Sequence, residues 1–101
     1  MFFGRWDAKI DPKWRLYIPN IINKQFGKSV LLKKDEEGCI VVQKPDLSDI
    51  EDYSTVSVEK IKNGGRIIIP DFLRESNSFY FGKNVTVAGR GDHLKIMPRP
   101  S

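Results

Sequence analysis

Short stretches in which hydrophobic and polar residues alternate recur along the chain and predict β-strands. Residues 6–10 and 56–59 alternate at every position, which is the period-two pattern of a half-buried strand. Further strands are predicted from short runs rich in hydrophobic residues, at 15–18, 29–33, 40–43, 66–69, 85–88 and 94–97. The chain is therefore predicted to be mainly β.

A short helix is predicted in each half, directly after an Ile-Pro pair. Pro19 and Pro70 end the preceding strand and suit the first position of a helix. In the first half, Ile21, Ile22, Gln25 and Phe26 fall near one face of one or two helical turns, and Gly27 closes the helix. In the second half, Asp71 lies in the first turn, where the helix dipole favours an acid.

Turn signals separate these elements. They occur at 11–13, at Asn63-Gly64, at 35–38 and at 89–92. Asn-Gly is a strong hairpin signal, because both central positions of that turn favour positive φ. The polar, acidic segment 46–55 is interpreted either as a short helix that begins at Ser48 or as a plain linker.

The chain also contains an internal repeat. Residues 9–19 and 60–70 share Lys, Ile, Arg, Ile and Pro at a constant offset of 51, and the block 27–30 returns at 82–85 with an offset of 55. We interpret 1–45 as a first repeat, 46–55 as an acidic connector and 56–101 as a second repeat. Neither copy is large enough to bury a core alone, so the two are expected to share one. A small closed or interleaved β-barrel of two ββαββ repeats would hide the strand edges.

Charge is unevenly distributed over these segments. The chain of 101 residues has a net charge of +4, which divides into +6 over 1–34, −6 over 35–55 and +4 over 56–101. Basic charge concentrated in the repeats indicates an anionic partner, with nucleic acid as the leading class. The alternative is that these lysines and arginines are the solvated faces of a slightly basic protein.

Several other classes of protein are excluded or disfavoured. The longest hydrophobic run is 39–42, too short to cross a bilayer, and the N-terminus does not have the pattern of a signal peptide. A single cysteine, Cys39, forms no internal disulfide and is expected to be a small buried hydrophobe. A cytoplasmic protein with no membrane partner is expected.

No catalytic or metal-binding constellation stands out. His93 is the only histidine, and one histidine with one cysteine cannot supply the three or four ligands of a zinc site. The glycine-rich segment 89–92 precedes a strand rather than a helix, so it is interpreted as a turn and not as a phosphate cradle. We predict a protein that is not an enzyme, with no cofactor, no metal and no small-molecule substrate.

The residues that carry candidate chemistry flank the first tight turn of each repeat. Arg15 and Arg66 each begin a strand after a turn, where a guanidinium can bind a phosphate or a guanine edge. The alternative is that the arginine stabilises the fold by pairing with Asp11, which is Lys62 in the second copy. Phosphate contacts or plain solvation are both open for the four flanking lysines, which are Lys9, Lys13, Lys60 and Lys62. Trp14 at the first turn is interpreted as an interface candidate, with base stacking as an alternative.

The string Asp-x-Lys-x-Arg-apolar-x-Ile-Pro at 11–19 resembles the motif of the AbrB-like swapped-hairpin superfamily. Two copies behind a Met-Phe-x-Gly start resemble its tandem-repeat branch, the MraZ family of bacterial transcription regulators. The resemblance implies a pseudo-two-fold swapped-hairpin barrel, a homo-oligomer, and basic residues of the hairpins and following helix that face double-stranded DNA. It identifies Arg15 and Arg66 as the motif arginines and Arg74 as the basic helix position, which is Asn23 in the first copy.

The chain departs from the family pattern at two positions. The motif acid is Asp11 in the first copy but Lys62 in the second, and the glycine before the arginine is Gly65 in the second copy but Trp14 in the first. Two functions are therefore carried forward. One is a sequence-selective DNA-binding transcriptional regulator associated with the nucleoid. The other is a non-catalytic protein-interaction or antitoxin-like module with weakened or lost DNA binding.

Overall fold

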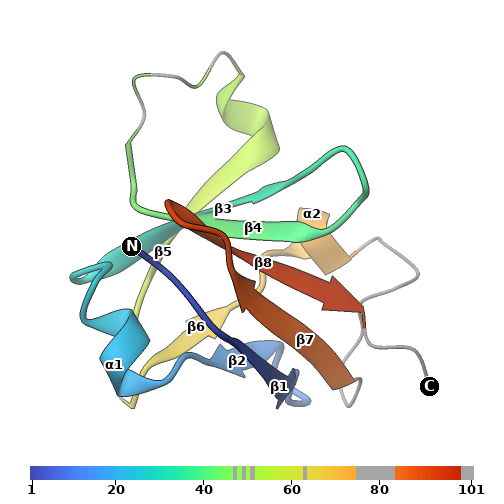
Figure 1. Ribbon diagram of the computed structural model, residues 1–101. Helices are drawn as coiled ribbons and strands as arrows, with labels where there is room; N and C mark the ends of the chain where they lie inside the picture. The colour runs from blue at the N-terminus through green and yellow to red at the C-terminus, as the bar shows by residue number, and fades with distance from the viewer. Residues whose placement is uncertain (47, 49, 51, 63, 75–83, 99–101) are drawn as a thin grey trace.

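The computed structural model describes residues 1–46, 48, 50, 52–62, 64–74 and 84–98. Their elements are mostly strands, which confirms the prediction of a mainly β protein (Figure 1). In chain order they are β1 (Arg5–Lys9), β2 (Arg15–Tyr17), α1 (Asn20–Asn23), β3 (Ser29–Lys34), β4 (Ile40–Gln43), the 3-10 helix η1 (Tyr53–Thr55), β5 (Val56–Lys60), β6 (Arg66–Ile68), α2 (Asp71–Arg74), β7 (Asn84–Gly89) and β8 (His93–Pro98).

Strands from the two halves of the chain are interleaved in the sheets, so that each half pairs with the other. A six-stranded antiparallel sheet has the order β1-β7-β8-β4-β3-β5, and β2 pairs with β6 in a separate two-stranded ribbon. The larger sheet is open, with β1 at one edge and β5 at the other. The swapped-hairpin barrel implied by the family resemblance therefore remains a prediction.

The strand register follows the offsets of the sequence repeat. Trp6 of β1 pairs with Val87 of β7. Ser57 of β5, 51 positions after Trp6, pairs with Leu32 of β3, 55 positions before Val87. In the ribbon, Leu16 pairs with Ile67, its own counterpart in the repeat. The pairings are thus related by a pseudo-two-fold axis that passes between Leu16 and Ile67.

One hydrophobic core joins the large sheet to the ribbon. Leu16 and Ile67 of the ribbon are fully buried in the same cluster as residues of β3, β4, β7 and β8. Near the N-terminus, the rings of Phe2 and Phe26 stack with 4.4 Å between their centroids. Cys39 is buried, as the sequence predicts.

Both predicted helices are present, and the first has one of the one or two turns expected but ends before Gly27. α1 ends at Asn23, and Phe26 reaches the core from the turn that follows. Ile21, predicted on the apolar face, is exposed instead. Asparagine at both ends of this segment is a weak helix former, which is consistent with a single turn of helix. α2 begins at Asp71, one position after Pro70, the predicted first residue of this helix.

The acidic connector contains a short helix, but not at the predicted position. Ser48 lies in a turn and donates its backbone N–H and its hydroxyl to Asp46, so a helix does not begin there. The helix of this region is η1, for which Asp52 provides the N-terminal cap. Asn63, part of the predicted Asn63-Gly64 hairpin signal, lies outside the described residues.

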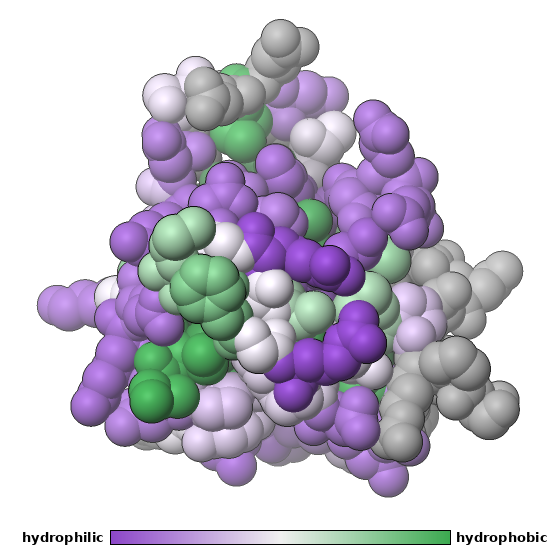
Figure 2. Space-filling model, in the orientation of Figure 1, coloured by the Kyte–Doolittle hydropathy of each residue, from purple (hydrophilic) through white to green (hydrophobic). Residues whose placement is uncertain are grey.

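The visible surface is mostly polar. Figure 2 shows hydrophobic atoms gathered over α1 and the N-terminal end of the chain, surrounded by hydrophilic ones. Met1, Phe3 and Ile21 are among the exposed large hydrophobic residues. None of the helices in the described ranges is long and apolar enough to span a membrane.

Candidate functional site

The β2–β6 ribbon brings the two motif arginines onto one face. Successive side chains of a strand point to opposite sides, and the central pair, Leu16 and Ile67, points into the core. The flanking pairs, Arg15 with Ile68 and Tyr17 with Arg66, therefore point outward. Arg15 and Arg66 are diagonal neighbours on this face, a relationship that corresponds to about 7–8 Å between backbones. We call these four residues the outward ribbon face.

Asp11 organises the turn that leads to Arg15. Its carboxylate accepts hydrogen bonds from the backbone N–H of Lys13 at 2.9 Å and of Arg15 at 2.8 Å. It also pairs with Arg15 Nε at 2.8 Å. Burial opposes ionisation, but the bonds from Arg15 and Lys13 outweigh it and lower the pKa of Asp11. The fold-stabilising pair that the sequence left open is therefore present, and it uses one of the five donors of the Arg15 guanidinium.

The turn before Arg66 has the same backbone hydrogen bonds without the acid. Lys62 N–H donates to Arg66 O at 2.8 Å, and Gly65 N–H donates to Lys62 O at 2.9 Å. The matching bonds in the first turn run from Asp11 to Arg15 at 3.0 Å and from Trp14 to Asp11 at 2.9 Å. The two turns therefore share these two hydrogen bonds although Lys62 replaces Asp11. Their backbones differ at the position before Trp14 and Gly65, where Gly64 has φ 78° and Lys13 does not have positive φ.

Both turns have a left-handed residue directly before the arginine, which explains the glycine in the repeat. Gly65 has φ 87°, and Trp14, at the same place in the first turn, has φ 61°. Trp14 is the one non-glycine residue with positive φ in the part of the chain that the structure describes. A left-handed backbone is costly for a residue with a Cβ, so other contacts must hold Trp14 in place.

Those contacts come from the second half of the chain. The backbone N–H of Ile69 donates to Trp14 O at 2.7 Å. The guanidinium of Arg74 lies over the indole ring, with Cζ 4.9 Å from its centroid. Arg74 also donates from Nε to Ile69 O at 2.7 Å and pairs with Asp71 at 2.9 Å. Trp14 itself is half-buried and packs against the core.

Three bacterial proteins named transcriptional regulator MraZ match this chain along nearly its whole length. The protein of Heliobacterium modesticaldum is 26% identical over 98% of this chain and 82% of the relative. Those of Mycoplasmoides gallisepticum and Alkaliphilus metalliredigens are each 28% identical over 95% of this chain and 80% of the relative. The chain is an MraZ-like protein. No family model matches it.

The four predicted lysines of this MraZ-like chain lie either on the turns of the ribbon or at the ends of the edge strands of the large sheet. Lys13 and Lys62 are exposed on the turns at opposite ends of the ribbon, because Arg15 lies opposite the end of β6 and Arg66 opposite the end of β2. Lys9 and Lys60 are also exposed. Each ends an edge strand of the large sheet just before one of these turns.

Sequence reasoning missed two members of the outward ribbon face. Tyr17 and Ile68 each lie two positions after a motif arginine, so strand alternation places them on the same side. Tyr17 is 50% exposed and is directly opposite Arg66. The alternation of residues within each strand contained this information, but it could be used only once β2 and β6 were known to pair.

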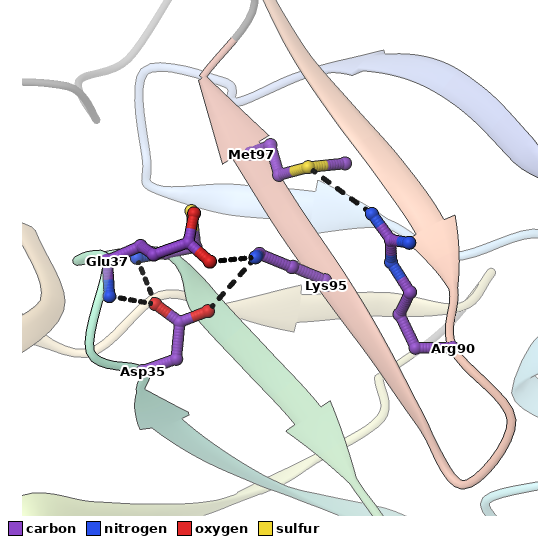
Figure 3. Close-up of polar contacts among 6 residues, drawn as sticks. Asp35, Glu37, Arg90, Lys95 and Met97 are labelled. Atoms are coloured by element: carbon purple, nitrogen blue, oxygen red, sulfur yellow. Dashed lines mark hydrogen bonds and ion pairs between the residues drawn. The ribbon is translucent and has the colours of Figure 1, made fainter.

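A second polar cluster lies away from the ribbon and joins β8 to the β3–β4 turn (Figure 3). Lys95 Nζ pairs with Glu37 at 3.0 Å and with Asp35 at 3.5 Å, and Asp35 accepts the backbone N–H of Glu37 and of Cys39. Burial raises the pKa of the Cys39 thiol. Among the described residues, no group of three or more His, Cys, Asp or Glu side chains is placed to hold a metal ion.

Proposed function

We propose that this MraZ-like chain is a sequence-selective, DNA-binding regulator of transcription with no catalytic activity. The observation that carries the proposal is the placement of Arg15 and Arg66 together on the outward ribbon face. The names of the MraZ relatives support a role in transcription. A regulator of this kind acts on chromosomal DNA, so we place the protein in the cytoplasm, with the nucleoid.

A two-stranded ribbon suits the major groove, which is about 12 Å wide and admits such a ribbon. Arginines on its outward face can donate two hydrogen bonds to O6 and N7 of guanine. Tyr17 and Ile68 beside them offer apolar surface for the methyl group of thymine. We therefore assign base recognition to the outward ribbon face.

We assign the electrostatic attraction to the DNA phosphates to the exposed lysines around the ribbon. Lys13 and Lys62 extend from its ends, and Lys9 and Lys60 lie just before the same turns. Contacts from such lysines to phosphate oxygens position the protein and release counterions, so binding weakens as salt rises. These residues contribute affinity rather than sequence discrimination.

The strand register supports a division into a repeat of 1–45, a connector of 46–55 and a repeat of 56–101 that form one unit. The family resemblance also supports a homo-oligomer, in which several ribbons would contact neighbouring DNA segments. Trp14 stays an interface candidate in this proposal, because Arg74 of the same chain covers one face of its ring and the side chain is only half-buried.

The proposal is tested by fluorescence anisotropy. The protein is titrated against the duplex upstream of its own gene and against a scrambled duplex, each at two salt concentrations. Tighter, salt-sensitive binding to the upstream duplex is expected. Equal affinity for both duplexes contradicts sequence selectivity, and no binding at low salt favours the protein-interaction module.

A further inference from the structure

The pseudo-two-fold axis relates two sets of three residues that hold the two turns. In one set, Ile69 N–H donates to Trp14 O at 2.7 Å, and Arg74 Nε donates to Ile69 O at 2.7 Å. In the other set, Ile18 N–H donates to Gly65 O at 2.8 Å, and Asn23 Nδ2 donates to Ile18 O at 3.1 Å. Each member is 51 positions from its counterpart. Both turns are therefore held from the helix that follows the partner strand.

The side chains that perform this task differ because the turn residue differs. A Cβ on Gly65 would lie 2.4 Å from both Asn23 Nδ2 and Ile18 O, so the second turn leaves no room for a side chain. The first turn carries an indole. There the longer Arg74 side chain reaches the equivalent carbonyl, that of Ile69, and lies over the indole ring. Trp14 with Arg74 thus forms one matched pair, and Gly65 with Asn23 forms another.

The first pair connects directly to a residue of the outward ribbon face. Arg74 contacts the Trp14 ring, and Trp14 N–H donates to Asp11 O at 2.9 Å. The Asp11 carboxylate in turn accepts from the backbone and from the Nε of Arg15. A continuous series of contacts therefore runs from α2 of the second half to the guanidinium of Arg15 in the first.

We propose that Arg74 is a positioning residue that orients Arg15 by holding the Trp14 ring, and that it does not itself contact DNA. We call the contact of Arg74 with the Trp14 ring the clasp. This inference rests on the proposed function for its effect on binding. It revises the expectation that the basic position of the second helix faces DNA. Three groups already engage the Arg74 guanidinium: the Ile69 carbonyl, the Asp71 carboxylate and the Trp14 ring.

The test is a double-mutant cycle on DNA affinity with Arg74→Met and Arg15→Ala, using the upstream duplex. Methionine keeps much of the side-chain length but removes the charge and the donors. A loss of about three- to tenfold is expected for Arg74→Met alone, the size of a partly exposed cation–π contact with its hydrogen bond. In the Arg15→Ala background the same change should add nothing. Independent, additive losses would show that Arg74 contacts DNA and would overturn the proposal.

A second readout does not depend on DNA. The Nε–H proton of Arg15, observed by NMR, should be protected from exchange by its bond to Asp11 and should lose that protection in Arg74→Met. Asn23→Ala, the matched change in the other helix, should leave it unchanged. An unchanged Arg15 signal in Arg74→Met contradicts the clasp, even if the protein does not bind DNA and the proposed function fails.

If Arg74→Met does not fold, Trp14→Phe replaces it in both experiments. Phenylalanine keeps an aromatic face but binds a cation less well than the indole does. Reduced protection of Arg15 Nε–H in the folded variant supports the clasp. Full protection together with wild-type affinity overturns it.

Discussion

The guanidinium carbon of Arg74 lies 4.9 Å from the centroid of the Trp14 ring, so a helix in the second half of the chain rests on a turn in the first. Trp14 occupies a left-handed backbone position that glycine fills in the second turn. The indole therefore compensates for an unfavourable backbone with contacts that a glycine could not make.

We predict that Trp14 and Arg74 are coupled in stability. Arg74→Asn should cost more in the wild-type background than with Trp14→Gly, because the double variant recreates the Gly65–Asn23 arrangement. A coupling of about 0.5–1 kcal/mol is expected from a partly exposed cation–π contact. Urea unfolding of the wild type, both single variants and the double variant measures it. Strictly additive losses would show that the ring and the guanidinium do not interact.

Gly65→Ala is predicted to destabilise the protein much more than Gly38→Ala. Both glycines have positive φ, at 87° and 82°, so the backbone strain of alanine is similar. A Cβ at Gly65 would also lie 2.4 Å from the Ile18 carbonyl oxygen, whereas a Cβ at Gly38 has no non-adjacent atom within 4 Å. The difference between the two variants should be about 1–3 kcal/mol, the usual cost of overpacking. Equal losses in chemical denaturation would contradict the close approach.

We predict that only the buried face of the ribbon, which carries Leu16, contributes strongly to the stability of the fold. Leu16→Ala is expected to cost about 2–5 kcal/mol because it opens a cavity in the core. Tyr17→Ala, at the next position on the outward face, should stay within about 0.5 kcal/mol of the wild type. Thermal unfolding compares the two. A large loss in Tyr17→Ala would mean that its side chain supports the fold rather than the proposed contact with DNA.

Acid should remove a contribution to stability made by Asp35. Burial works against ionisation, but the backbone N–H groups of Cys39 and Glu37 and the ammonium of Lys95 outweigh it, so the pKa of Asp35 lies below its ordinary value of 3.8. A depressed pKa contributes stability above the pKa of the unfolded state, and this contribution disappears as the pH falls through the pKa of the folded state.

The measurement is the free energy of unfolding as a function of pH for the wild type and for Asp35→Asn. The wild type should be more stable at neutral pH, and its advantage should shrink as the pH falls below about 4. Glu36→Gln, which removes a neighbouring exposed charge, serves as the control. An advantage over Asp35→Asn that persists undiminished to pH 2 would contradict the assigned pKa.

Much of the fold could be predicted from local sequence patterns. Alternation located β1 and β5, short hydrophobic runs located the other strands, and the Ile-Pro pairs located both helices. Asp11 lay close enough in sequence for its pairing with Arg15 to be anticipated. These features depend on residues that are near one another along the chain. The predicted end of α1 at Gly27 was wrong because Phe26 reaches the core from a turn after the helix has ended.

What escaped prediction depends on the partnership of β2 with β6, which lie 51 residues apart. No local pattern determines that Tyr17 faces Arg66 or that Arg74 reaches Trp14. The repeat did contain a clue to the backbone of Trp14, since glycine at the matching position indicates a conformation with positive φ. That clue becomes informative only when the two turns are superimposed.

The most direct test of the account is the DNA affinity of Arg15→Ala and Arg66→Ala, with Arg90→Ala as a matched loss of one exposed arginine from the β7–β8 turn. Each ribbon variant should lose about 1–3 kcal/mol of binding free energy for the upstream duplex and lose selectivity over the scrambled one. Arg90→Ala should retain that selectivity. If both ribbon variants bind and discriminate like the wild type, the outward ribbon face is not the surface that recognises DNA.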